Sequence, residues 1–169
     1  MGMVVRIGMV EELVKILPVL LLLKFSKAIN EPFDYILYAS ISALGFAFIE
    51  NIMYFGFGIG SITIRGIYCC IVHMTFSATV GYGLMLIKYR GYNKLLTFGL
   101  FFFLASFMHG FYDFWLLDWW AYQYSWVTDL FVIIAIHLWI SYINNTLNVS
   151  TFYRKNIRFN QYRIQFISL

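Results

Sequence analysis

The chain has 169 residues, of which 62% are hydrophobic and only 12% are charged. A typical soluble domain is about 25% charged, and a soluble protein of this size exposes too much of its surface to hide so many apolar residues. The excess apolar surface therefore has to face lipid. This composition excludes a soluble globular enzyme and a disordered chain. The two cysteines, Cys69 and Cys70, are adjacent, which excludes a disulfide-stapled secreted domain.

Five apolar stretches are each long enough for a membrane-spanning helix, which needs about 20 residues. They are continuous rather than alternating, which favours helices over a β-barrel. We therefore predict an all-α polytopic transmembrane bundle of about five spans over residues 1–149, followed by a basic tail at residues 150–169. In chain order, the expected spans cover residues 4–23, 35–57, 67–87, 95–117 and 126–147.

The basic residues lie mostly on one side of this predicted bundle. With five spans, the connections at 24–34 and 88–94 share a side with the C-terminal tail, and that side holds nine of the twelve Lys and Arg residues. The opposite side holds Arg6 and Arg65, while Lys15 lies within a span. The positive-inside rule then places the C-terminus in the cytoplasm and the N-terminus outside. The net charge of +4 thus reflects membrane orientation rather than nucleic-acid binding.

Ionisable residues inside the expected spans are rare, costly and by default functional. In the first span, Lys15 follows Glu11 by four residues and Glu12 by three, so it can pair with either carboxylate. Nothing ionisable accompanies His137 in the fifth span, and we interpret it as a packing histidine. The spans between carry Glu50 followed by Asn51, then His73, and then His109 with Asp113 four residues later.

Four of these groups fall at a similar depth, each about six to eight residues from the outer end of its span. At 1.5 Å per residue this depth is roughly 9–12 Å. The agreement predicts one polar cavity in the outer half of the bilayer, with a structural hydrogen-bond network as the alternative. Consecutive residues point about 100° apart, so only one of Glu11 and Glu12 would aim straight into the cavity. The four groups are Glu11, Glu50, His73 and His109.

The polar motifs resemble those of the PrsW family of intramembrane proteases, which belongs to the wider group of CAAX prenyl proteases and bacterial self-immunity proteins. One such motif is weak, but four in order over residues 10–115 are specific. Relatives usually carry further spans ahead of the Glu-Glu motif, so we expect a minimal or truncated member. The motifs are Glu11-Glu12-x-x-Lys15, Phe46-x-x-x-Glu50-Asn51, His73-x-x-Phe76 and His109-x-x-Tyr112-Asp113.

The resemblance implies an intramembrane endopeptidase that hydrolyses a peptide bond of membrane-anchored proteins, anti-sigma factors among them. It implies a location in the cytoplasmic membrane of a prokaryote. The expected depth of the polar cavity agrees with cleavage near the extracytoplasmic side of that membrane. The lipid bilayer and the anchored substrate are the expected partners.

Amide hydrolysis needs an activated water and a donor to the oxyanion that forms. We expect Glu11 or Glu12 to act as general base. His109, supported by Asp113, would donate to the oxyanion or protonate the leaving amine, and Lys15 would keep one carboxylate ionised. The expected catalytic set is completed by Glu50 and His73, which orient the water, and the supporting set comprises Lys15, Asn51 and Tyr112.

A metal-dependent version would use some of the same residues. Two histidines and a carboxylate, namely His73, His109 and Glu50, form a zinc-type ligand set that leaves one position open for water. The helical motif His-Glu-x-x-His is absent, so the sequence does not select zinc, and we slightly favour a metal-free glutamic mechanism.

Three other functions remain alternatives. A transporter or proton-relay protein would distribute polar residues across the full bilayer thickness, whereas here the inner half holds few of them. A CAAX-type prenyl protease would use similar motifs. A membrane scaffold would use the buried charges only to set helix register.

Overall fold

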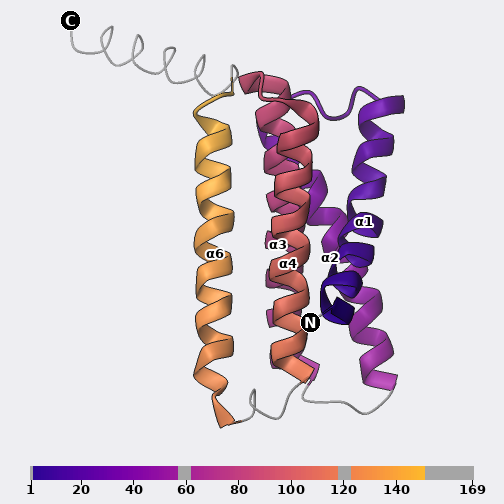
Figure 1. Cartoon of the computed structure of the whole chain (residues 1–169), viewed down its shortest axis with the longest axis vertical. Helices are drawn as coiled ribbons and strands as arrows, with labels where there is room; N and C mark the ends of the chain where they lie inside the picture. The colour runs from indigo at the N-terminus through magenta and orange to yellow at the C-terminus, as the bar shows by residue number, and fades with distance from the viewer. Residues whose placement is uncertain (1, 57–61, 118–122, 151–169) are drawn as a thin grey trace, which may run out of the picture.

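The computed structural model describes residues 2–56, 62–117 and 123–150 (Figure 1). Within these ranges the chain is all-helical, which confirms the predicted fold class. The expected basic tail lies outside the described residues from residue 151 onward. The helices are α1 (Gly2–Phe25), α2 (Pro32–Gly56), α3 (Ile62–Arg90), α4 (Lys94–Leu117) and α6 (Ser125–Leu147).

Two residues with specific backbone or capping roles set the boundary between α3 and α4. Gly91 ends α3 with a φ of 71°, a left-handed conformation that costs glycine little. Two residues later, the side chain of Asn93 accepts a hydrogen bond from the backbone N–H of Leu96 at 3.0 Å and so caps α4. The largest difference from the predicted spans is in α3, which begins at residue 62 rather than 67.

Four helices, α2, α3, α4 and α6, are long and apolar enough to cross a membrane. The remaining described helix, α1, has a similar length of 24 residues but carries charged side chains along it. Together with the lipid-compatible composition, these helices make the chain an integral membrane protein. Its orientation in the membrane stays a prediction.

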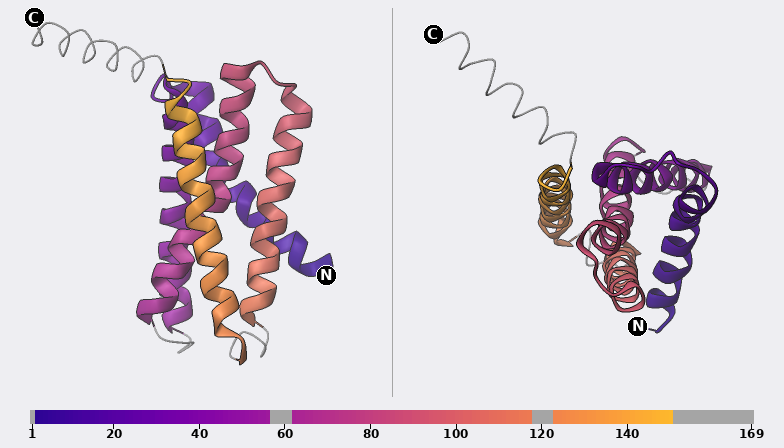
Figure 2. Two further views of the ribbon diagram at one scale, coloured as in Figure 1. Left: turned by 90° about the vertical axis from the view of Figure 1, so that its left-hand side faces the viewer. Right: turned by 90° about the horizontal axis from the view of Figure 1, so that it is seen from above.

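Helix α3 is the centre of the bundle, because it packs against α2, α4 and α6. Helix α1 packs mainly against α4 and α2 and runs obliquely across the other helices (Figure 2). A helix that leans across its neighbours brings the residues of one turn close to several helices at once. This is how α1 contributes to a site shared with α2, α3 and α4.

The crossing of α1 and α4 depends on glycine. A Cβ atom added at Gly8 would meet the backbone oxygen of Ser106 and lie 2.8 Å from the backbone nitrogen of Gly110. Small residues allow such close backbone contact between membrane helices. Because Glu11 and Glu12 follow Gly8 by one turn and His109 precedes Gly110, this contact also brings the carboxylates to the histidine.

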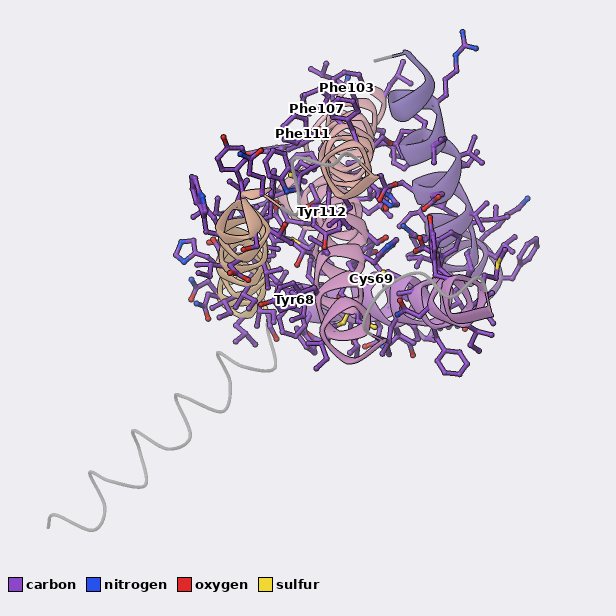
Figure 3. The ribbon with its side chains drawn as sticks, turned by 90° about the horizontal axis from the view of Figure 1, so that it is seen from below. Tyr68, Cys69, Phe103, Phe107, Phe111 and Tyr112 are labelled. Atoms are coloured by element: carbon purple, nitrogen blue, oxygen red, sulfur yellow. The ribbon has the colours of Figure 1, made fainter. Side chains whose placement is uncertain are left out.

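The outer face of α4 carries an aromatic row. Phe103, Phe107 and Phe111 recur every fourth residue and stack with ring centroids 6.4 and 6.3 Å apart. Figure 3 shows the three rings along one side of the helix, away from the bundle interior. Such an exposed apolar row suits a surface that faces lipid.

Candidate active site

The buried ammonium of Lys15 lies at the centre of the polar cluster. Its Nζ lies 3.0 Å from Glu12 Oε1 and 3.7 Å from Glu11 Oε2. It also lies 2.6 Å from His73 Nδ1 and 3.2 Å from His109 Nδ1. One side chain of α1 thus contacts histidines from both α3 and α4, so the predicted convergence of these helices on one polar site is correct.

Glu12 is fully enclosed by hydrogen-bond partners. Its Oε1 lies 3.0 Å from Lys15 Nζ and 2.9 Å from His109 Nδ1, while Ser77 Oγ donates to its Oε2 at 2.7 Å. The side chain has no exposed surface. A carboxylate with this many donors is held in place, and it holds Lys15 and His109 in turn.

His73 is fixed at both ring nitrogens. The Lys15 ammonium only donates, so it donates to Nδ1, and the ring proton then resides on Nε2. That nitrogen lies 3.0 Å from Glu50 Oε2, to which it donates. The Glu50 side chain is 19% exposed, so this carboxylate is the part of the His73–Glu50 pair that a molecule from outside the bundle can reach.

Glu11 and His109 meet with two unsatisfied atoms. Glu11 Oε2 and His109 Nε2 lie 3.2 Å apart, and both are buried without a hydrogen-bond partner among the described residues. Asp113 Oδ2 approaches the same nitrogen at 3.4 Å. Buried polar atoms without a hydrogen bond cost free energy, so these two atoms mark a position where a water, an ion or a substrate atom would be stabilised.

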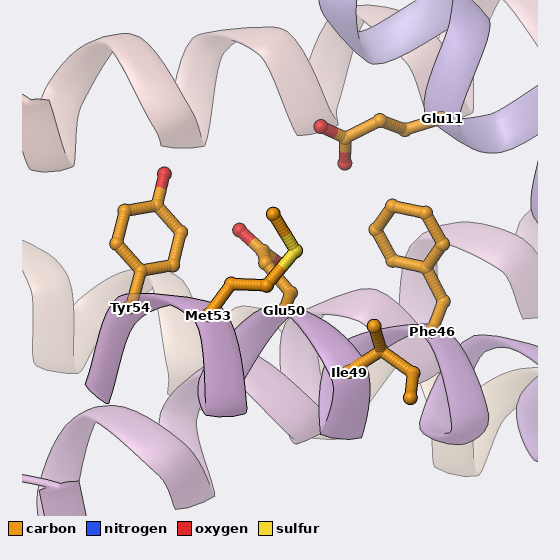
Figure 4. A pocket seen from close by; sticks show the side chains of 6 residues that line it. All are labelled: Glu11, Phe46, Ile49, Glu50, Met53 and Tyr54. Atoms are coloured by element: carbon orange, nitrogen blue, oxygen red, sulfur yellow. The ribbon is translucent and has the colours of Figure 1, made fainter. Parts of the chain in front are cut away.

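A cavity of about 490 Å³ lies against Glu11, between α1 and α2. Figure 4 shows Glu11 facing the α2 side chains across it. The Glu11 side chain is 22% exposed, in contrast to the enclosed Glu12. The cavity is lined by Glu11, Phe46, Ile49, Glu50, Met53 and Tyr54.

Two predicted supporting residues make contacts with residues outside this cluster. Asn51 donates from Nδ2 to Cys70 Sγ at 3.9 Å. Tyr112 is buried in an apolar cluster and packs edge-on against Phe76. The Phe76 ring lies 5.7 Å from the His109 ring, so Tyr112 contacts the site through Phe76. The expectation that His137 packs inside is wrong, because its side chain is exposed on α6.

Two contributors, Ser77 and Phe46, had no role assigned to them from the sequence, although Phe46 belongs to one of the motifs. The Ser77 hydroxyl anchors Glu12, and the i, i+4 spacing from His73 was the only signal that placed it on the same face. The ring of Phe46 lies 4.5 Å below the Lys15 ammonium, a cation–π contact that covers the apolar side of that charge.

Among the residues that the structure describes, two groups of side chains have the spacing to hold a metal ion. One is Glu11, His73 and His109, and the other is Glu50, Cys69 and His73. The predicted ligand set of Glu50, His73 and His109 is neither of these groups: His73 belongs to both, His109 to the first and Glu50 to the second. The 3.2 Å between Glu11 Oε2 and His109 Nε2 approaches the roughly 3.3 Å expected between two ligands of a tetrahedral zinc ion. The donor types fit zinc, and His73 would give up one of its two ring contacts, to Lys15 or to Glu50, in order to bind the ion.

Fold and site together define a polytopic helical membrane protein that encloses carboxylates and histidines of the kind used in hydrolysis. Over residues 1–141 the chain matches the family described as PrsW family intramembrane metalloprotease. It is 31% identical over 139 residues to the protease PrsW of Clostridioides difficile (strain 630). The chain belongs to the PrsW family, as its motifs predicted.

The match to the Clostridioides difficile protein covers 78% of this chain and 57% of that relative. The chain thus spans little more than half the length of the curated relative it matches. No solved structure matches the chain.

Proposed function

We propose that this chain hydrolyses a peptide bond of membrane-anchored proteins, near the extracytoplasmic side of a prokaryotic cytoplasmic membrane. The observation that carries the proposal is the contact of Glu11 Oε2 with His109 Nε2, two buried atoms that lack a hydrogen bond, together with the cavity that Glu11 lines between two helices. Membership in a protease family supports the same reaction.

Glu11 rather than Glu12 is the proposed general base. Glu12 has both oxygens occupied by donors and no exposed surface, whereas Glu11 borders the cavity. A water held between Glu11 and Glu50 would give its proton to Glu11 as its oxygen attacks the carbonyl carbon. His73 holds Glu50 in the position needed to orient that water.

His109 is the proposed donor to the leaving group. In the charged imidazolium, Nδ1 donates to Glu12 Oε1, which directs Nε2 toward Glu11 and Asp113. When the C–N bond breaks, the new amine takes a proton from this imidazole. Asp113 positions the ring and stabilises its charged form.

The family description as a metalloprotease makes zinc the relevant cofactor to test. Glu11, His73 and His109 would hold it, and bound zinc would polarise the scissile carbonyl and favour a hydroxide at neutral pH. Elemental analysis and activity measurements of the purified protein, before and after chelation, distinguish the metal-free glutamic mechanism from the zinc-dependent mechanism. Full activity with no zinc supports the glutamic version, and a stoichiometric zinc whose removal abolishes activity supports the metal version.

The proposal is tested by cleavage of single-span substrates in proteoliposomes. Glu11→Gln should lower the rate about 10³-fold or more while leaving thermal stability unchanged, because it removes the base but keeps the shape. Asp129→Asn, on the exposed surface of α6, is the matched carboxylate control and should retain the wild-type rate. Undiminished cleavage by Glu11→Gln would remove Glu11 from the mechanism.

A further inference from the structure

The cavity beside Glu11 has a regular wall. Apart from Glu11, its lining comes from α2, at positions 46, 49, 50, 53 and 54. This spacing of three and four residues forms one face of a helix. Figure 4 shows these side chains rising from the same side of α2 toward Glu11. One helix face thus presents both a carboxylate and an apolar surface to the same space.

The apolar part of this wall opens outward. Ile49 and Met53 line the cavity and are 57% and 58% exposed at the surface of the bundle. In an integral membrane protein such a surface faces lipid, so an apolar group enters here without crossing water. The volume of about 490 Å³ falls within the range of about 300–1,000 Å³ typical of ligand pockets. It is large enough for a bulky side chain and the adjoining backbone.

The charges at the inner end of the cavity are already paired. Glu50 receives the hydrogen bond of His73, and Glu11 lies near Lys15 and His109. A second cation there would face Lys15, and an acidic side chain would face two carboxylates. An incoming charge would also lose its hydration against apolar walls, so the cavity favours an uncharged, apolar occupant.

We propose that this cavity is a specificity pocket for a large apolar side chain, such as Phe, Leu or Met, of the substrate residue that flanks the scissile bond. The inference rests on the proposed function and names its substrate class. With the side chain against Phe46, Ile49 and Met53, the adjoining peptide bond lies beside Glu11 and Glu50. The substrate segment must be unwound there, because a helix does not present its carbonyls to an outside nucleophile.

A substrate series tests the preference directly. The residues on either side of the mapped cleavage site of a single-span substrate are changed one at a time to Phe, Leu, Ala, Lys or Asp. At one of the two positions, kcat/KM for Phe and Leu should exceed that for Ala by about tenfold or more, with Lys and Asp lowest. Equal rates for Phe and Ala at both positions, or a preference for Lys or Asp, would overturn the proposal.

Substitutions in the pocket test whether the side chains of α2 determine the preference for an apolar substrate residue. Ile49→Trp should fill the cavity and lower cleavage of the Phe substrate about tenfold more than that of the Ala substrate. Ile52→Trp is the matched control, because Ile52 is equally exposed on the same helix but does not line the cavity. Met53→Ala should enlarge the pocket and raise the relative rate for a Trp substrate. Parallel losses for both substrates with Ile49→Trp, together with no gain for Met53→Ala, would contradict the assignment.

A binding measurement separates this inference from the proposed reaction. Single-span peptides with Phe or Ala at the selected position are titrated onto the wild type and Ile49→Trp in detergent, with fluorescence as the readout. Tighter binding of the Phe peptide, lost in Ile49→Trp, supports the pocket even if the chain cleaves nothing, in which case only the proposed function fails. Equal binding of both peptides contradicts the pocket whether or not cleavage occurs.

Discussion

At the scale of single residues, the two consecutive glutamates of α1 have different surroundings. Glu12 accepts hydrogen bonds on both oxygens, from Lys15 and Ser77, whereas Glu11 borders the cavity. Helical geometry alone predicted that only one of them would face the cavity, without deciding which. These contacts are the reason for proposing Glu11 as the reacting carboxylate, whereas Glu12 contacts Lys15 and His109 and holds both in place.

Lys15 should be the most sensitive residue for stability. Lys15→Met keeps the volume but leaves Glu12 as a buried carboxylate without its cation, which should cost about 3–5 kcal/mol of unfolding free energy. Denaturation in detergent, followed by circular dichroism, measures this loss. The control is Lys24→Met, at the exposed end of α1. Equal stability of the two variants would show that the buried pair contributes nothing.

At the scale of helices, the sequence was sufficient to predict five helices and the convergence of their polar residues. The continuous apolar runs predicted the helices. The helical spacing of the polar residues and their similar depth in the membrane predicted that Glu50 and His73 lie near the residues of α1, as they do. The oblique course of α1 was not predictable from its own residues, because it depends on contact between Gly8 and the backbone of α4. Ser77 also had no role assigned to it from the sequence, which did not indicate that the side chain of Asn51, an expected supporting residue, would contact Cys70.

The helix crossing gives a second stability prediction. Gly8→Ala should push α1 from α4, lower stability by about 1–3 kcal/mol and reduce cleavage, since Glu11 would move away from His109. Gly99→Ala is the matched control, because a Cβ at Gly99 meets nothing within 4 Å. Thermal unfolding of both variants in detergent provides the comparison. A Gly8→Ala protein as stable and active as the control would contradict the role of this crossing.

At the scale of the whole molecule, the fully buried charged and histidine side chains of the described residues, which are Glu12, Lys15, His73 and His109, all belong to the candidate site. Directly beyond Lys15, a fully buried apolar cluster fills the space between helices α1, α2, α3 and α4. A transporter or proton relay needs polar groups across the full thickness of the membrane. The apolar cluster that occupies this space instead comprises Ile16, Val19, Ala39, Val80 and Ala105.

Because the apolar cluster separates the polar site from the other end of the bundle, we predict that the protein does not transport protons. Proteoliposomes with the wild-type protein and an internal pH indicator should dissipate a proton gradient no faster than empty liposomes, with a protonophore as the positive control. Faster dissipation that disappears in Glu50→Gln would support a proton relay instead. The same vesicles serve the cleavage assays, so both functions are compared on one preparation.

The reaction proposed for the cluster around Glu11 is the hydrolysis of a peptide bond within the membrane. Mass spectrometry of a single-span substrate, incubated in proteoliposomes with the wild type or Glu11→Gln, measures this most directly. We predict a new carboxyl terminus inside the extracytoplasmic half of the substrate span with the wild type, and none with Glu11→Gln. An intact substrate with both proteins, or the same cut with both, would contradict the account.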